Sequence, residues 1–181
     1  MDSPRLGLIG TGMITQEFAA ATKAENAFEL VAMMSRSSAT ARSFIEDADL
    51  DRVCITTEIS ELLGHSLDAV YIASPNSFHK NHALAAIDAG VNVMVEKPAF
   101  WNPAQWQEVH RAAERAGVLV FEAARHLFEP GFETVGQWVD EQKSSGREVT
   151  GASLNFHQYS SRWDAVLAGQ EPNIFSLCHG G

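Results

Sequence analysis

The chain has 181 residues, enough for one ordinary domain or for one domain and part of a second. Apolar residues make up 45% of it and charged residues 20%, which is a globular composition that can build a large core. The net charge of −10 argues against proteins that wrap nucleic acid or lie on anionic membranes, because no basic surplus is available to meet phosphates.

Short apolar runs alternate with helical patterns from the first residues onward. In the helical pattern 103–117, Asn102 is the expected cap, Pro103 the first helical residue and Gly117 the stop. The alternation predicts an α/β fold, a Rossmann-type doubly wound parallel sheet with helices on both faces. The predicted strands are 5–10, 28–35, 52–57, 68–74, 91–97 and 118–123, and the predicted helices between them are 13–24, 38–48, 58–65, 77–90 and 103–117.

The pattern changes after residue 124. Residues 131–146 predict one helix, and residues 148–161 alternate between apolar and polar types, which is typical of a half-exposed antiparallel strand. We therefore predict an NAD(P)-binding Rossmann domain at residues 1–124. Residues 125–181 would be the incomplete start of a C-terminal α/β substrate domain with an antiparallel sheet, because one strand and a helix cannot form such a domain alone.

The first candidate site is a glycine turn between the first strand and the first helix. Gly10 and Gly12 form a G-x-G pattern, and Thr15 stands where a third glycine often lies. Glycine lets the backbone approach a pyrophosphate, while the helix N-terminus offers free N–H donors. We expect the turn to bind a dinucleotide, although a purely structural turn is the alternative. The expected binding residues are Gly10, Thr11, Gly12, Met13 and Ile14.

The end of the second strand indicates which dinucleotide binds. NAD-binding domains usually place a carboxylate here for the ribose hydroxyls, whereas this chain has Ser35 and Arg36. A guanidinium with hydroxyls suits a 2′-phosphate, so we expect NADP as the cofactor, with NAD still possible. The alternative is a solvated arginine in a loop.

The end of the fourth predicted strand supplies a third candidate. The turn at Ser74, Pro75 and Asn76 leads into a helix near whose start His79 lies, and this edge of a parallel sheet faces the ligand crevice. We predict that all four contact the cofactor. A turn with only capping duties explains the same residues equally well.

The fifth strand ends in Glu96, Lys97 and Pro98. A lysine at this edge can hydrogen-bond a substrate oxygen while a hydride moves, so Lys97 is the predicted catalytic residue, and both Glu96 and Lys97 are expected beside the cofactor. The alternative is a surface ion pair, which the opposite directions of adjacent strand residues disfavour. Pro98 makes a cis peptide bond possible.

Metal binding and membrane insertion are not expected. Cys54 and Cys178 lie far apart, and the seven histidines match no zinc motif, although His79 and His82 lie one helical turn apart. The cysteine pattern predicts a reduced, cytoplasmic protein. The chain contains no signal-peptide pattern and no window that approaches about 18 apolar residues.

Three stretches together resemble the glucose–fructose oxidoreductase/inositol dehydrogenase (Gfo/Idh/MocA) family: "GLIGTGMI", "ASPNSFH" and "EKP", in this order and spacing. The resemblance implies an NAD(P)-dependent oxidoreductase acting on a sugar, polyol or related hydroxyl or carbonyl compound. It also implies pyrophosphate at Gly10 and Gly12, the adenosine ribose at Ser35 and Arg36, and Lys97 near the reacting oxygen. Members of this family often have a cis bond before the proline of E-K-P.

The family resemblance also implies a longer chain. In similar sequences, a stretch like Gly180-Gly181 continues into a helix that carries further proton-transfer residues. We therefore expect a piece that binds cofactor and a small-molecule substrate class but lacks part of its active site, in a protein that forms a homo-oligomer. Two alternatives remain open at this point: a non-catalytic dinucleotide-binding sensor or regulatory protein, and an unstable fragment that associates through an exposed half-sheet.

Overall fold

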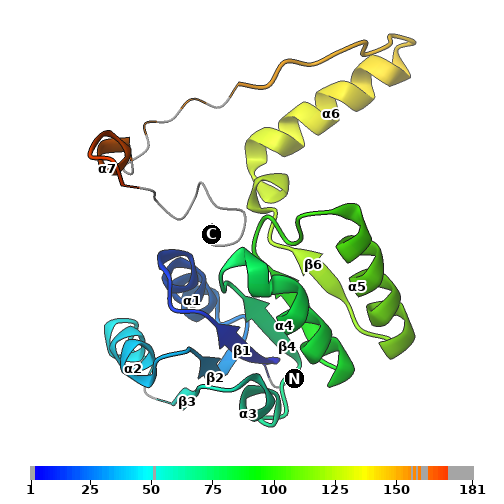
Figure 1. The fold of residues 1–181 in the computed structure, drawn as a ribbon. Helices are drawn as coiled ribbons and strands as arrows, with labels where there is room; N and C mark the ends of the chain where they lie inside the picture. The colour runs from blue at the N-terminus through cyan, green and yellow to red at the C-terminus, as the bar shows by residue number, and fades with distance from the viewer. Residues whose placement is uncertain (1–2, 51, 156, 158, 160–162, 171–181) are drawn as a thin grey trace. The chain divides into compact units, whose positions relative to one another are not determined.

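The computed structural model describes residues 3–50, 52–155, 157, 159 and 163–170 (Figure 1). Its contacts divide the chain into two compact units, one that ends at Ala123 and one that begins at Ala124. The first unit contains a parallel six-stranded sheet with strand order β3-β2-β1-β4-β5-β6. This order confirms the doubly wound Rossmann topology, in which β2 and β3 extend the sheet on one side of β1 and β4, β5 and β6 extend it on the other. The strands are β1 (Arg5–Ile9), β2 (Glu29–Met34), β3 (Cys54–Thr56), β4 (Ala69–Ile72), β5 (Asn92–Val95) and β6 (Val120–Glu122).

Helices cover both faces of this sheet (Figure 1). Buried side chains of α1 and α2 join one core cluster with Leu6 and Leu8 of β1. Side chains of α3, α4 and α5 join a second cluster with Ile9 of β1 and Val70 of β4. Two cores therefore hold the central strands from both sides. The helices are α1 (Met13–Glu25), α2 (Ser38–Asp47), α3 (Ile59–Leu63), α4 (Asn76–Asp88) and α5 (Pro103–Ala116).

The boundaries of α5 follow the predicted capping residues. The Asn102 side-chain oxygen accepts a hydrogen bond from the Gln105 N–H at 2.9 Å, and Pro103 is the first helical residue. Gly117 ends the helix with φ +70°, a conformation that glycine adopts without a Cβ clash. The sequence-based expectation for this helix is confirmed at both ends.

The second unit differs from the prediction in its strand. The predicted helix forms as α6 (Pro130–Ser144), after a 3₁₀ turn, η1 (Arg125–Phe128), and a short helix, α7 (Trp163–Leu167), follows. Residues 148–155 form no strand, and the rest of the predicted strand, apart from 157 and 159, lies outside the described residues. A strand needs a hydrogen-bonded neighbour, and the described residues of this unit offer none, so the alternating pattern was a wrong guide to this stretch.

Candidate functional site

The candidate site residues lie at one edge of the sheet, where four neighbouring strands end. Strands β2, β1, β4 and β5 are adjacent and parallel, so their carboxyl ends share this edge. Each is followed by one of the stretches that the sequence singled out, beginning at Ser35, Gly10, Ser74 and Glu96. The fold therefore brings together segments as far apart in the sequence as Gly10 and Glu96 at the place where doubly wound sheets bind ligands.

Gly10 has a conformation and a packing environment that only glycine fits. Its φ is +111°, and a Cβ there would lie 2.5 Å from the backbone oxygen of Ala73. Its N–H donates to the Met34 carbonyl at 3.0 Å, so this one residue joins β1 to the ends of both neighbouring strands. The tight turn is thus required by the protein's own backbone.

Gly12 is a glycine for a different reason. Its φ of −77° suits any residue, and a Cβ there would meet no atom within 4 Å. It precedes α1, whose N-terminus has no side-chain cap and no acidic residue in its first turn. A helix N-terminus with open space in front of it presents free N–H donors and a positive dipole end, which suits a phosphate group.

Two buried oxygens near this edge have no hydrogen-bond partner among the described residues: the Thr15 hydroxyl and the Asn76 side-chain oxygen. Thr15 lies in the first turn of α1, and Asn76 begins α4, the helix after the adjacent strand β4. An unsatisfied buried polar group costs about 1–3 kcal/mol. Their position is what a polar ligand along the ends of β1 and β4 would explain, so these residues fit a dinucleotide.

The end of β2 carries a cation without a carboxylate. Ser35 is half-buried and Arg36 is exposed. The Ser35 hydroxyl accepts a 3.4 Å bond from the Ser37 N–H, and the Ser37 hydroxyl caps α2 by accepting from the Thr40 N–H at 3.3 Å. In the described part of the chain, Arg36 enters no salt bridge, so its guanidinium faces solvent at the edge of the site.

His79 lies beneath the turn after β4 and not on its surface. Only 1% of the residue is exposed. Its Nε2 lies 2.8 Å from the Ser74 carbonyl oxygen, and its Nδ1 lies 3.1 Å from that of Pro98. This placement differs from the direct cofactor contact that the sequence suggested for His79, because both ring nitrogens already face the protein's own backbone.

His82 lies one turn further along α4 and contacts the same turn. Its Nδ1 lies 3.0 Å from the Ser74 hydroxyl. Burial, with a smaller contribution from His79, lowers the pKa of His82 to about 4. In the neutral tautomer with its hydrogen on Nε2, the Nδ1 of His82 accepts the hydroxyl hydrogen of Ser74, and the Ser74 oxygen then keeps its lone pairs for another donor. In the part of the chain that the structure describes, no group of side chains could hold a metal ion.

The loop after β5 carries Lys97, which is exposed, and the Lys97–Pro98 peptide bond is cis. The Glu96 carboxylate accepts a 2.7 Å bond from the Tyr71 hydroxyl and a 3.2 Å bond from the Lys97 N–H. The Ala99 N–H donates to the Glu122 carboxylate at 2.9 Å. Carboxylates from β6 and from the loop itself therefore fix the backbone on both sides of Lys97 while its amine stays accessible.

Tyr71 supports this loop from inside the sheet. The residue is 1% exposed, and its ring stacks on Phe18 of α1 with centroids 3.8 Å apart. Burial raises the pKa of the Tyr71 phenol, and the hydrogen bond to Glu96 raises it further. The hydroxyl therefore keeps its proton and acts as a donor to Glu96 across the physiological range.

Sequence reasoning missed four residues that support the site: Thr15, Tyr71, His82 and Glu122. Thr15 was read only as a replacement for glycine, and the hydroxyl of Tyr71 was counted with an apolar strand. Glu122 gave one usable signal, because it is the lone carboxylate of the last strand. The other contacts depend on which residues of distant elements meet, which the sequence alone does not reveal.

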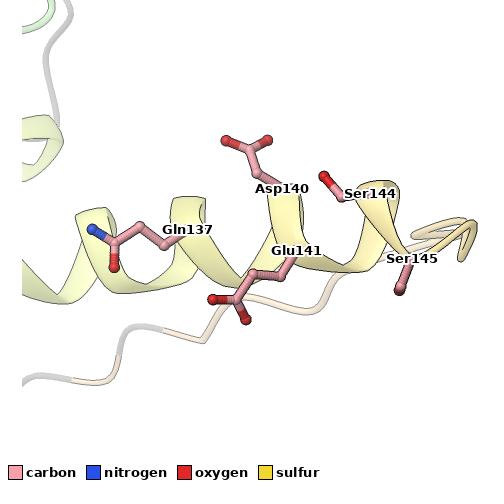
Figure 2. A pocket seen from close by; sticks show the side chains of 5 residues that line it. All are labelled: Gln137, Asp140, Glu141, Ser144 and Ser145. Atoms are coloured by element: carbon pink, nitrogen blue, oxygen red, sulfur yellow. The ribbon is translucent and has the colours of Figure 1, made fainter.

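A hollow elsewhere in the chain is unrelated to these residues. It lies on α6 and is lined by Gln137, Asp140, Glu141, Ser144 and Ser145 (Figure 2). The close-up shows their side chains leaving a single helix, with two carboxylates among them. An acidic face of one exposed helix is an ordinary solvated surface. None of the predicted site residues lies there.

In the described part, no helix is long and apolar enough to span a bilayer.

Comparison with known proteins gives a consistent result. The Gfo/Idh/MocA profile, described as an oxidoreductase family with an NAD-binding Rossmann fold, matches residues 4–124. The uncharacterized oxidoreductase YgjR of Escherichia coli (strain K12) is 31% identical over 172 residues, which are 95% of this chain and 51% of YgjR. The scyllo-inositol 2-dehydrogenase (NADP(+)) IolU of Bacillus subtilis (strain 168) is 33% identical over 172 residues, 94% of this chain and 51% of IolU.

A solved structure agrees with these sequence matches. KijD10, a 3-ketoreductase from Actinomadura kijaniata crystallised with NADP and TDP-benzene, superposes with a TM-score of 0.71 at 28% identity. The match covers 77% of this chain and 43% of KijD10. The chain therefore spans about half the length of the curated relatives that it matches.

Proposed function

Because this chain belongs to the Gfo/Idh/MocA oxidoreductase family, we propose that it is the cofactor-binding part of an enzyme that transfers a hydride between NADP and a sugar, polyol or related compound. One observation carries the proposal. At the ends of adjacent strands, an uncapped helix N-terminus follows an open glycine turn, and two buried oxygens near this edge have no partner among the described residues. A dinucleotide with its diphosphate and ribose hydroxyls supplies the missing acceptors and donors.

The candidate residues have distinct roles in this proposal. The turn from Gly10 to Ile14 holds the diphosphate. Ser74, Pro75 and Asn76 lie along the nicotinamide ribose, with the Ser74 oxygen accepting a bond. Glu96 and Lys97 border the nicotinamide. When bound, the cofactor supplies or accepts the hydride at its nicotinamide ring, which is chemistry that no side chain here can perform.

NADP is preferred over NAD in this proposal because of the end of β2. Arg36 is exposed there, and Ser35 lies beside it. A guanidinium pairs with a 2′-phosphate through charge-assisted bonds, and the residues 35–38 contain no carboxylate that would favour an unmodified ribose. Two relatives support this choice, since IolU is named as NADP-dependent and KijD10 was crystallised with NADP.

Lys97 is the proposed catalytic residue. Its backbone is fixed through Glu96 and Ala99, and its side chain is exposed at the edge of the site. An ammonium group so placed can donate a hydrogen bond to the oxygen of the reacting carbon and share its proton as the carbonyl or hydroxyl forms.

The remaining parts of the proposal concern the whole protein. We propose that residues 1–124 form the cofactor domain and that residues 125–181 open a substrate domain. The polyol class rests on IolU, which is named a scyllo-inositol 2-dehydrogenase, and the sugar class rests on the family resemblance. We also propose a cytoplasmic location, from the cysteine usage, and a homo-oligomeric protein.

Titration of the chain with NADPH and NADH, followed by nicotinamide fluorescence, tests the proposal. We expect NADPH to bind more tightly than NADH. Gly12→Ala should weaken NADPH binding at least about tenfold, because its Cβ enters the phosphate space, while leaving the fold intact. Failure of the unmodified chain to bind either nucleotide below millimolar concentration would refute the proposal.

A second variant tests the cofactor preference. Arg36→Ala should weaken NADPH about 10- to 100-fold, which corresponds to the loss of one or two charge-assisted bonds, and should leave NADH affinity unchanged. Arg42→Ala is the matched control, because Arg42 is also exposed but lies on α2, and this variant should change neither affinity. An equal effect of the two variants would contradict the assignment of Arg36.

A further inference from the structure

We propose that His79 is a positioning residue that sets the spacing between the two turns on which the site depends, the Ser74 turn and the loop that carries Lys97. The inference rests on the proposed function, because these turns flank the nicotinamide end of the cofactor. It replaces the direct cofactor contact expected of His79 from the sequence. In this inference the buried side chain contacts the backbone of both turns and touches neither cofactor nor substrate.

The geometry gives His79 contacts on both sides. Its Nε2 lies 2.8 Å from the Ser74 oxygen, at the end of β4. Its Nδ1 lies 3.1 Å from the Pro98 oxygen and 3.3 Å from the Ala99 oxygen, in the loop after β5. The imidazole sits on the first turn of α4 and is almost fully buried. One rigid ring thus spans the gap between two loops from neighbouring strands.

The chemistry of these contacts makes the ring a link and not a filler. Carbonyl oxygens only accept hydrogen bonds, so each ring nitrogen must carry a hydrogen to bond its side. A neutral imidazole carries one hydrogen and holds one turn, whereas an imidazolium carries two and holds both. The link to both turns therefore requires the doubly protonated ring, with a hydrogen on Nε2 for the Ser74 oxygen and one on Nδ1 for the Pro98 oxygen.

The link matters because the two turns carry different parts of the proposed reaction. Ser74 lies on the ribose side, and Pro98 directly follows Lys97 in the chain. Displacing a catalytic group by about 1 Å can cost on the order of 100-fold in rate. Glu122 and Tyr71 also hold the Lys97 loop, but they reach it from β6 and from within β4, and neither contacts the Ser74 turn through the bonds described.

Two substitutions separate the two halves of the link. A glutamine side chain places its amide near the position of Nε2, and an asparagine places its amide near that of Nδ1. His79→Gln should keep the Ser74 bond and release the Lys97 loop, so that amide hydrogen exchange accelerates about tenfold at residues 96–101. His79→Asn should accelerate exchange at residues 74–78 instead and weaken NADPH binding about tenfold.

His110→Gln serves as the matched control, since His110 is an exposed histidine on α5 outside the site. It should leave both segments and the NADPH affinity unchanged. Equal acceleration of both segments in both His79 variants, or no local change in either, overturns the link. The exchange measurement needs no cofactor and tests only the link through His79. Failure of the wild-type chain to bind NADPH is a separate result that refutes the proposed function.

A measurement on the unmodified protein keeps the inference testable if both variants unfold. Long-range ¹H–¹⁵N NMR reports which ring nitrogens of a histidine carry hydrogens. We expect hydrogens on both Nε2 and Nδ1 of His79 in the folded wild-type chain, because each nitrogen faces a carbonyl oxygen. A ring nitrogen without a hydrogen cannot bond the carbonyl oxygen that it faces, so the absence of either hydrogen overturns the proposal.

Discussion

The two units of this chain differ in whether they bury their own apolar side chains. Up to Ala123, each strand packs on a helix that is close in sequence, and both faces of the central strands are covered. From Arg125 onward, none of the described residues is buried. Large apolar side chains there are exposed, among them Leu127, Phe128, Phe132, Val135 and Trp138.

The difference shows what an apolar pattern specifies. In the first unit, strand and helix alternate, so each element meets its partners within a few tens of residues. In the second unit, the pattern of residues 148–155 demands a neighbouring strand that the described chain does not provide. The proposed cofactor site lies in the unit whose sheet is covered on both faces by its own helices.

The largest contrast is expected between two glycines, one in each unit. Gly10→Ala places a Cβ 2.5 Å from the Ala73 oxygen at a positive φ, so we expect the first unit to lose about 3 kcal/mol in unfolding free energy. Gly136→Ala in α6 meets no atom and should stabilise that helix by about 1 kcal/mol. Urea denaturation and amide exchange in α6 measure the two effects. Equal responses would contradict the contrast between the units.

The next prediction concerns the accessible cation of the first unit. In a full-length enzyme that carries this sequence, Lys97→Ala should lower turnover about 100-fold or more through loss of general acid–base help. Thermal stability should change little, since the Lys97 side chain is exposed. Steady-state kinetics gives the result, and an unchanged kcat would remove Lys97 from the mechanism.

A third effect depends on pH and comes from His82. Its pKa lies near 4 in the folded state and near 6.5 when unfolded, so the unfolded chain binds more protons between these values. Stability is therefore full above pH 6.5 and falls as the pH drops towards 4. The loss is about 2 kcal/mol after allowance for the partly exposed ring. His82→Asn should flatten the profile of unfolding free energy against pH, and an unchanged slope would contradict the burial of a neutral His82.

The smallest effect is expected at Tyr71. Tyr71→Phe keeps the stacking on Phe18 and removes only the hydroxyl that donates to Glu96. We expect the first unit to lose about 1.5 kcal/mol, the value of a hydrogen bond to a charged acceptor. Exchange at the Lys97 amide should also become faster, because Glu96 loses its anchor. Phe18→Leu is a control that disturbs the stack and leaves the hydroxyl, so it should spare the Lys97 amide.

The sequence predicted what short-range chemistry determines. The Rossmann alternation, the glycine turn and the Asn102 cap follow from local residue patterns, whereas the cis bond before Pro98 was implied by the family resemblance. The pairing of Tyr71 with Glu96 could not be predicted, because it depends on the register that sets Ile72 opposite Val95.

The burial of His79 could not be predicted from the sequence for the same reason. Its partners belong to two loops, one of them about 20 positions away, and only the assembled sheet brings them to the ring. The strand at residues 148–161 failed for the opposite reason, since its local pattern was clear but no partner strand lies in the described chain.

The most direct test of the account is NMR titration of the ¹⁵N-labelled chain with NADP. In the proposed function, the backbone amides of the turn from Gly10 to Ile14 receive the cofactor diphosphate. We expect these amides to show the largest and saturable shifts, and Gly12→Ala to abolish them. NADP binding that leaves these amides unmoved while others shift would contradict the account.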